Sequence, residues 1–303
     1  MAKTALFYCE EAEKHLTGSH HPESPLRSLA ILRAVEANHL AVPVMRPEAA
    51  TEADLLRNHS KHHLEAIQAS CLNGIPYDDP DTVMGPDSWD AALLAAGAGI
   101  TAAEAVLDGQ IDNAFVIMRP PGHHAEYEGA MGFCLFNNIA ITARWLKEKG
   151  HAKKLAILDF DVHHGNGTQN AFYEDDSVLF ISIHEYPLFP GSGYPYERGK
   201  NDTNLNIQMP PGGTSDQWLD TIKEVALPQL TAFAPNFLLL SAGFDAHRMD
   251  PLANQLLESE DFGTITRMVK PLADGRIISF LEGGYNLDAL AESATAHITA
   301  LME

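Results

Sequence analysis

The sequence predicts an α/β fold in which a mostly parallel sheet carries helices on both faces. Two observations lead to this prediction: short, almost continuous apolar runs recur along the 303 residues, and longer helical patterns separate them. Strands covered on both faces have such apolar runs, whereas strands with one wet face alternate apolar and polar residues. The chain shows no internal repeat, low-complexity stretch or linker-like boundary. We therefore expect a single domain over residues 1–303.

The predicted elements alternate in order along the chain. Apolar runs of strand length lie at 4–9, 114–118, 155–160, 178–183, 236–241 and 276–281. Helical patterns lie at 24–37, 60–72, 88–108, 137–149, 215–233, 260–273 and 287–301. Because parallel strands need a long crossover connection, usually a helix, this alternation favours a parallel sheet.

Composition and charge narrow the possible functions. Apolar residues make up 45% of the chain, which is enough for a large buried core, and the formal net charge is −21. A surface this acidic repels phosphate backbones, so direct nucleic-acid binding is disfavoured, and it attracts cationic partners such as lysine-rich tails or polyamines. Solubility alone explains the same charge equally well.

Three features indicate a cytoplasmic protein that does not enter a membrane. The longest apolar runs are strand-sized and fall short of the roughly 20 residues that cross a bilayer. The first residues, MAKTALFYCEEAEK, lack the basic segment and apolar stretch of a signal peptide. Cys9, Cys71 and Cys134 lie far apart without CxxC spacing, as is typical of reduced thiols.

Polar motifs follow several of the predicted strands. The strand at 114–118 leads into MRPPGHH, and the strand at 155–160 ends in DFDVHHGNG. The strand at 236–241 leads into SAGFDAHRMDP, and the strand at 276–281 into EGGYN. Active sites of open parallel sheets lie at the carboxyl ends of the strands. We therefore expect these motifs to meet at one edge of the sheet.

A metal site is predicted where the strand at 155–160 ends. Asp159, Asp161 and His163 are two residues apart, so in an extended chain they share a face. Asp245 is placed to join Asp161 and His163 as a third ligand. Two carboxylates and one imidazole leave a coordination position open, which is typical of catalytic zinc, although iron(II) or cobalt suits the same donors. A lone Asp-x-His motif is more often a cap or a surface pair, but that explanation leaves the other motifs unexplained.

The remaining motifs supply groups for amide hydrolysis. Such a reaction needs a base that deprotonates water and an acid that protonates the leaving amine, and His123 and His124 can divide these tasks. Asp159 and Asn166 are candidate partners for the two imidazoles. Tyr285, after a glycine pair, can donate a hydrogen bond to the oxyanion.

The other histidine groups precede a predicted helix or lie on one. We expect surface or packing roles for His20, His21, His59, His62 and His63. His247 follows Asp245 at the same spacing as His163 follows Asp161, but no second carboxylate is expected nearby on a matching strand. It is therefore left out of the predicted metal site.

These motifs resemble the histone deacetylase family, in particular its class II branch and the bacterial histone deacetylase-like amidohydrolases. The resemblance extends from HHPESPLR to LEGGYNLDALAES. Its most specific part is RPPGHHAEYEGAMGFCLFNNIAITARW followed by LDFDVHHGNGTQNAF. It implies the arginase–deacetylase fold, with a mostly parallel sheet of about eight strands flanked by helices.

The resemblance also implies catalytic roles. It makes one zinc ion the cofactor, bound by Asp161, His163 and Asp245. His124 becomes the general base and later the acid, and His123 its electrostatic partner, oriented by Asp159. Tyr285 becomes the transition-state donor. Class I relatives usually carry an aspartate at Asn166, so this residue favours class II.

For the substrate, the resemblance implies a narrow channel. Phe133 and Phe189 match two aromatic residues that enclose the methylenes of acyl-lysine, with Gly132 beside Phe133. Asp78 resembles a rim aspartate that binds substrate backbone. Leu252 stands where acetylpolyamine-specific relatives carry a glutamate at the channel mouth.

The family further implies bound potassium and an internal cavity. The first potassium would use Asp159, Asp161, His163, Ser182 and Ile183, and the second Phe172, Asp175 and Val178. Arg27 resembles the arginine of a cavity through which acetate leaves.

The leading hypothesis is zinc-dependent hydrolysis of the acetyl amide of acetyl-lysine in a protein or peptide, with release of acetate. The alternative is an acetylpolyamine amidohydrolase, which Leu252 and the lack of a long N-terminal insertion disfavour. A ureohydrolase would need two manganese ions and additional bridging aspartates. A non-catalytic acyl-lysine-binding module would have no need of His123, His124 and Tyr285.

Overall fold

The protein folds around one eight-stranded sheet, seen here in a computed structural model that describes residues 2–74, 77 and 79–303. The strands are β1 (Thr4–Phe7), β2 (Val44–Met45), β3 (Asn113–Val116), β4 (Leu155–Asp159), β5 (Val178–Glu185), β6 (Asn204–Met209), β7 (Phe237–Ala242) and β8 (Ile277–Leu281). Their order across the sheet is β2-β1-β3-β8-β7-β4-β5-β6, and every pair is parallel. The predicted fold class is confirmed.

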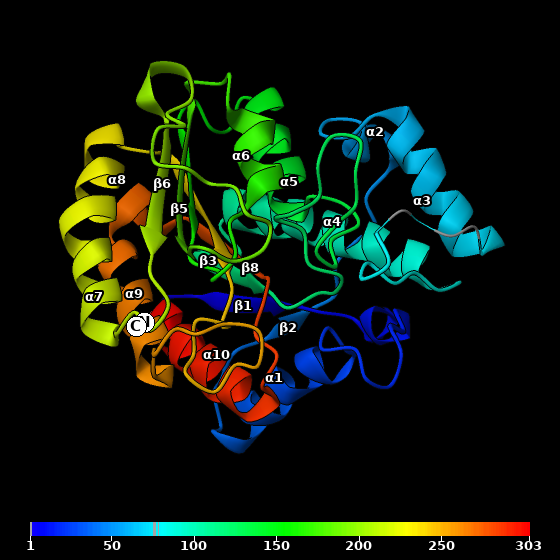
Figure 1. Ribbon diagram of the computed structural model, residues 1–303, viewed down its shortest axis with the longest axis horizontal. Coiled ribbons are helices and arrows are strands. Elements are labelled where there is room, and N and C mark those ends of the chain that lie inside the picture. The colour runs from blue at the N-terminus through cyan, green and yellow to red at the C-terminus, as the bar shows by residue number, and fades with distance from the viewer. Residues whose placement is uncertain (1, 75–76, 78) are drawn as a thin grey trace.

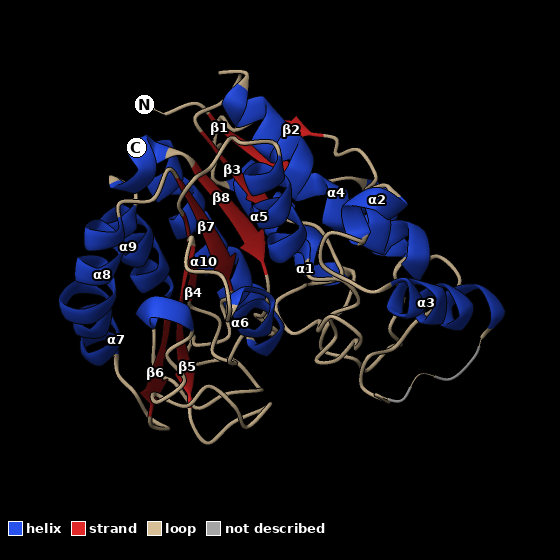
Figure 2. Ribbon diagram, turned by 90° about the horizontal axis from the view of Figure 1, so that it is seen from above, coloured by secondary structure: helices blue, strands red, loops and turns tan. Residues whose placement is uncertain are grey.

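Helices cover both faces of the sheet (Figures 1 and 2). One layer contains α1 (Leu26–Ala37), α7 (Ser215–Thr221), α8 (Leu227–Phe233), α9 (Ser259–Val269) and α10 (Leu287–Met302). The other contains α4 (Ser88–Leu107), α5 (Asn138–Glu148) and α6 (Asn166–Phe172), with α2 (Glu52–Leu55) and α3 (Lys61–Asn73) beside them. Short 3-10 turns occur at η1 (Glu10–Lys14), η2 (Lys200–Asp202) and η4 (Leu272–Gly275).

The central strands form the core because both of their faces are covered. β4, β7 and β8 are buried along their whole length, as their continuous apolar sequences predict. α4 is also a core helix: it is apolar and long enough to cross a membrane by composition alone, but 67% of its apolar window is buried inside the fold. Its hydrophobicity is therefore explained by packing against β3, β8 and α5.

The elements that the sequence analysis did not predict are short or polar. β2 has only two residues, β6 carries polar residues and is only partly buried, and α6 starts in the Gly-rich motif after β4. The single helix predicted at 215–233 contains a π turn, η3 (Ile222–Ala226), between α7 and α8. Pro228 follows directly at the start of α8, where its missing N–H changes the bonding of the preceding turn.

Candidate active site

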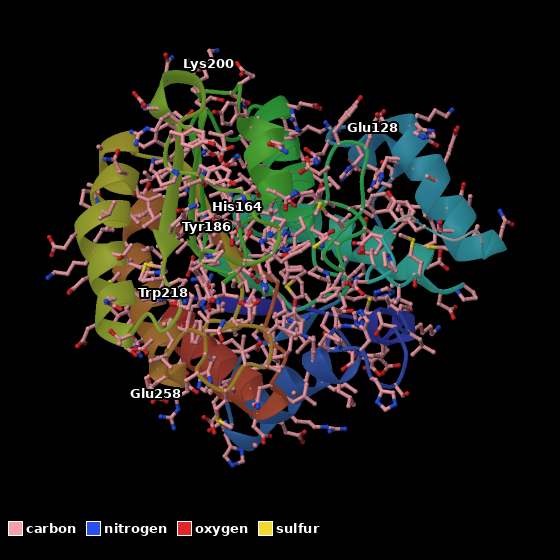
Figure 3. The ribbon with its side chains drawn as sticks, viewed as in Figure 1. Glu128, His164, Tyr186, Lys200, Trp218 and Glu258 are labelled. Atoms are coloured by element: carbon pink, nitrogen blue, oxygen red, sulfur yellow. The ribbon has the colours of Figure 1, made fainter. Side chains whose placement is uncertain are left out.

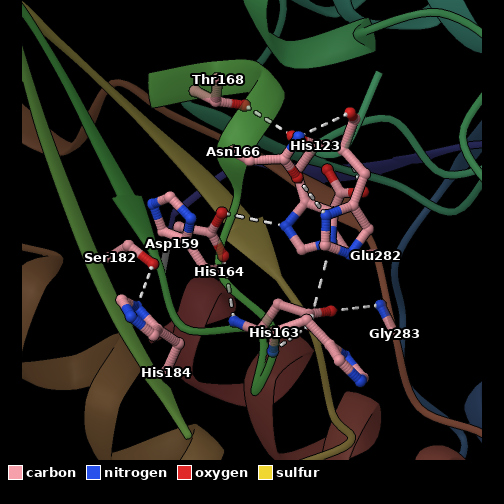
Figure 4. A network of polar contacts seen from close by, with 12 residues as sticks. His123, Asp159, His163, His164, Asn166, Thr168, Ser182, His184, Glu282 and Gly283 are labelled. Carbon is pink, nitrogen blue, oxygen red and sulfur yellow. Dashed lines mark hydrogen bonds and ion pairs between the residues drawn. The ribbon is translucent and has the colours of Figure 1, made fainter. Parts of the chain in front are cut away.

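The motifs that follow β3, β8, β7 and β4 lie together because these strands are neighbours in the sheet. Their carboxyl ends open on one edge, close to His164, which is labelled in Figure 3. Figure 4 shows the resulting polar network, which links His123, Asp159, His163, Asn166 and Glu282. The sheet order thus places the predicted site residues side by side.

Asp161, His163 and Asp245 form a compact buried group whose ligand atoms all lie within 4.8 Å of one another. Nδ1 of His163 lies 3.1 Å from Oδ1 of Asp161 and 3.0 Å from Oδ2 of Asp245. Backbone amides fix the carboxylates: Val162 N–H donates to Asp245 at 2.9 Å, and Gly283 N–H to Asp161 at 2.6 Å. These three side chains are therefore placed so that they could hold a metal ion.

Gly283 shows how closely the backbone approaches this group. A Cβ atom at this position would overlap the carboxylate of Asp245 and lie 2.6 Å from that of Asp161. Only glycine leaves room for both carboxylates here, so the first glycine after Glu282 is required by the site.

Negative charge is in excess around this group. Asp159, Asp161, Asp245 and Glu282 are fully buried, and across the described parts of the chain no Lys or Arg side chain forms an ion pair with them. Burial, and then the charge of Asp161, raise the pKa of Asp245. Buried carboxylates are stable as anions only when they are paired or bind a metal. The residues thus fit a divalent cation.

His123 is held as a cation by its aspartate neighbours. Nδ1 of His123 is 3.0 Å from Oδ2 of Asp159. Burial alone would lower the pKa of His123, but the negative charges of Asp161 and Asp159 outweigh it and raise the pKa to about 10. This imidazole is therefore suited to electrostatic stabilisation more than to proton exchange.

His124, whose ring centroid lies 3.9 Å from that of His123, has a different environment. Its Nδ1 is 2.7 Å from Oδ1 of Asn166, a neutral partner. Burial, and then the positive charges of His123 and His163, lower its pKa well below the usual value. Asn166 in turn donates to Glu126 at 2.5 Å, a partner that the sequence analysis did not identify. The two adjacent histidines thus differ in their readiness to accept a proton.

A channel of about 240 Å³ leads to these residues, and its wall includes His124, His163 and Tyr285. The ring of Phe133 meets the Tyr285 ring edge-to-face at 5.8 Å, and the Phe189 ring lies 5.1 Å from that of His124. Gly132 and Leu252 also line the channel. A larger surface hollow of about 600 Å³ between α1, α9 and α10 contains none of these residues.

The channel also contains residues that sequence reasoning missed. Asp79, Asp81 and Leu188 line it, and Asp79 accepts a hydrogen bond from Gly132 N–H at 3.2 Å. Asp78, the residue proposed for the rim, lies outside the described residues. The segment YDDPDT offered three aspartates, and its sequence alone did not indicate which of them face the channel.

The other histidines lie outside the cluster of ligand atoms. His59 and His63 are buried: His59 accepts Asn137 N–H at 2.9 Å, and His63 lies 2.9 Å from the Leu135 carbonyl oxygen. His20 and His62 are exposed, and His247 contacts Ser259. His21 packs against the channel residue Phe133, with ring centroids 4.7 Å apart.

The residues suggested for potassium fall into two groups. Asp159 pairs in register with Ser182, and Ile183 follows on β5. In the second group Asp175 N–H donates to the Phe172 carbonyl at 2.9 Å, and Val178 N–H to the Asp175 carbonyl at 3.1 Å. The carboxylate of Asp175 contacts the amine of Lys147, so a cationic group already lies there.

Comparison with known proteins gives one consistent result. A family model described as the histone deacetylase domain matches residues 21–301. The chain is 37% identical over 311 residues to a probable deacetylase of Archaeoglobus fulgidus, covering 99% of this chain and 86% of that protein. It is 37% identical over 313 residues to a histone deacetylase-like amidohydrolase of Pseudomonas aeruginosa, covering 94% and 82%. The crystal structure of the HDA15 HD domain superposes with a TM-score of 0.93 at 35% identity, covering 98% of this chain and 90% of that one.

Proposed function

The chain belongs to the histone deacetylase family, and we propose that it hydrolyses the acetyl amide of acetyl-lysine in proteins or peptides, releasing acetate in a zinc-dependent reaction. One observation carries this proposal. A proton-accepting histidine, a phenol and an excess of buried carboxylates converge at the inner end of a narrow channel. The channel suits a long alkyl chain that ends in a small acyl group.

Asp161, His163 and Asp245 would bind the zinc ion. When bound, zinc acts as a Lewis acid that polarises a carbonyl group and makes water more acidic. With three protein donors, a bound zinc ion would keep a position for water or substrate, as catalytic zinc requires.

His124 would carry out the proton transfers. Its Nδ1 is engaged by Asn166, so Nε2 remains available to the channel. Because burial favours its uncharged form, His124 can accept a proton from the attacking water and return it to the departing amine nitrogen. Cationic His123 stabilises the negative charge that develops, and the Tyr285 hydroxyl donates a hydrogen bond to the carbonyl oxygen.

One observation favours a second candidate, hydrolysis of an acetylated polyamine. The carboxylates of Asp79 and Asp81 line the channel, and they attract a distant ammonium group of the substrate as well as a basic peptide. Leu252 also lines the channel, but its side chain carries no charge that could bind this ammonium group. We therefore keep acetyl-lysine as the first substrate.

The choice is tested by measuring acetate release from an acetyl-lysine peptide and from N-acetylputrescine under the same conditions. We expect the peptide to be cleaved with the higher kcat/KM. A higher kcat/KM for the polyamine would replace the substrate assignment, and absence of acetate from both substrates would reject the deacetylase function.

The proposal also includes bound potassium and a cytoplasmic location. Potassium binding rests on the family resemblance and, for the first ion, on Asp159 and Ser182, which pair in register. A cytoplasmic location is supported by the thiols of Cys9, Cys71 and Cys134, which are free and buried.

A further inference from the structure

The peptide group that joins Gly284 to Tyr285 is held at both of its polar ends by side chains. Nε of Arg27 donates to the Gly284 carbonyl oxygen at 2.7 Å. The Tyr285 N–H donates to Oδ2 of Asp250 at 2.7 Å. The orientation of this peptide plane, which carries the Tyr285 Cα atom, is fixed from two directions.

Such a restraint matters because the preceding backbone is intrinsically free. Gly283 and Gly284 lack side chains, and Gly284 has φ of +116°, a conformation that other residues rarely adopt. The Tyr285 ring has the Arg27 guanidinium over it at 4.9 Å and Phe133 at its edge, but neither contact fixes the backbone. Without a restraint on its peptide plane, the phenol would sample several positions in the channel.

Asp250 makes a second contact with its other oxygen. Oδ1 accepts the Leu252 N–H at 3.0 Å, and Leu252 is part of the channel wall. The side chain is 8% exposed, and it joins the loop after β7 to the loop after β8, the neighbouring strand. One carboxylate therefore holds both the tyrosine and a wall residue that faces the substrate.

We propose that Asp250 is a positioning residue that holds the Tyr285 hydroxyl where the carbonyl oxygen of the substrate binds and holds Leu252 on the channel wall. This inference rests on the proposed deacetylase function. It assigns no metal-binding or proton-transfer role to Asp250. A misplacement of about 1 Å in an active site can cost about 10²-fold in rate, so the expected effect is large for a residue that does not touch the substrate.

The test compares Asp250→Asn and Asp250→Ala with the parent enzyme on an acetyl-lysine peptide. Asn keeps the size of the side chain but can accept only one of the two N–H groups, and Ala accepts neither. We expect kcat to fall about 10-fold for Asn and about 10²-fold for Ala, within the cost of a misplaced catalytic group. Because Asp250 is not a ligand, the zinc content should stay unchanged.

A second background separates positioning from general damage. In Tyr285→Phe, which has no hydroxyl to position, Asp250→Asn should lower kcat by less than about 2-fold, as expected for two residues that act as one unit. Glu185→Gln is the matched control, since Glu185 accepts the Asn254 N–H at 2.9 Å in the same loop but does not contact Tyr285. We expect Glu185→Gln to keep kcat within about 3-fold of the parent, because Glu185 does not hold Tyr285 and so is not coupled to the phenol.

Two results would overturn the inference. One is an Asp250→Asn enzyme with parental kcat, and the other is an equal loss of kcat in the parental and Tyr285→Phe backgrounds. A parent enzyme that releases no acetate from any acetylated amine is a different result, because it would reject the proposed function itself. Thermal unfolding of each variant shows that the compared proteins are folded.

Discussion

Two clusters of buried charge lie near the carboxyl end of the sheet, and they differ in how the charges are balanced. The Glu23 cluster contains Glu23, Arg27, Arg119 and His15, and the aspartate cluster contains Asp159, Asp161, His163 and Asp245. In the first, two guanidinium groups pair with one carboxylate, so every carboxylate has a cationic partner. In the second, carboxylates face only imidazoles. The comparison indicates that the Glu23 cluster, whose carboxylate is paired with arginine, contributes to stability, and that the aspartate cluster, which lacks such partners, serves function.

The Glu23 cluster is internally satisfied. Arg119 contacts both carboxylate oxygens of Glu23 and donates to the Ala12 carbonyl at 3.1 Å, while Arg27 lies 3.3 Å from Glu23. Burial raises the pKa of Glu23, but the charge and hydrogen bonds of Arg119 outweigh it and lower the pKa to about 2. Because its carboxylate is paired with two guanidinium groups, this cluster does not need a bound cation.

The largest effect is expected in the histidines that adjoin the aspartate cluster. His124→Ala should lower kcat by about 10²–10⁴-fold, because it removes the group that exchanges protons with water and amine. His123→Ala should cost less, because this imidazole contributes charge and no proton transfer. Steady-state kinetics on an acetyl-lysine peptide measures both, and equal losses would contradict the division of labour.

A carboxylate-to-amide change in each cluster should affect stability in different ways. Glu23→Gln leaves Arg27 and Arg119 buried without a counter-charge and should cost about 3–5 kcal/mol of unfolding free energy. Asp245→Asn in the metal-free protein should cost little, because it relieves repulsion with Asp161. Urea unfolding of both metal-free variants and of the parent measures the two losses of unfolding free energy. Equal losses in the two variants would contradict the proposed difference between the clusters.

Tyr285→Phe tests the catalytic role of the residues beside the aspartate cluster without changing a predicted metal ligand. Loss of one oxyanion donor typically costs about 10²–10³-fold in kcat. Tyr285 is not one of the predicted metal ligands, so we expect an unchanged zinc content and an unfolding temperature close to that of the parent. A variant that keeps full activity would remove Tyr285 from the mechanism.

The smallest effect concerns buried histidines outside the aspartate cluster. Burial lowers the pKa of His297 to about 3, and its ring nitrogens contact only the hydroxyls of Thr266 and Ser279, at 2.6 and 2.8 Å. The unfolded chain takes up this proton below about pH 6.5, so stability is lost as the pH falls from 6.5 towards 3, by about 1.4 kcal/mol per unit. His297→Gln should therefore show a shallower fall in unfolding free energy between pH 7 and 5. If the unfolding free energy of the parent and of His297→Gln falls equally steeply with pH, His297 is not the group responsible.

The fold was predictable where burial leaves a clear pattern in the sequence. β7, with the sequence FLLLSA, is covered on both faces and reads as a strand, whereas the partly buried β6, with NLNIQM, does not. The site residues at strand ends were predictable for a related reason. The carboxyl ends of neighbouring parallel strands meet at one edge, so Asp161, Asp245 and Tyr285 had to lie near one another.

The residues behind the site were not predictable from the sequence. Glu282 accepts the N–H groups of Gly122 and His123 at 2.8 and 3.1 Å, and Asp250 accepts that of Tyr285. Backbone amides are present at almost every position, so a carboxylate that binds them leaves no distinctive spacing. Only the three-dimensional arrangement identifies these partners.

The most direct test of the functional role of the aspartate cluster is zinc-dependent acetate release. The protein is stripped with a chelator and titrated with zinc, while acetate release from an acetyl-lysine peptide is measured. We predict that activity disappears on stripping and returns in proportion to zinc until each chain holds one ion, and that Asp245→Asn fails to recover. Undiminished hydrolysis by the stripped protein, or full recovery of Asp245→Asn at the same zinc level, would contradict the role assigned to this cluster.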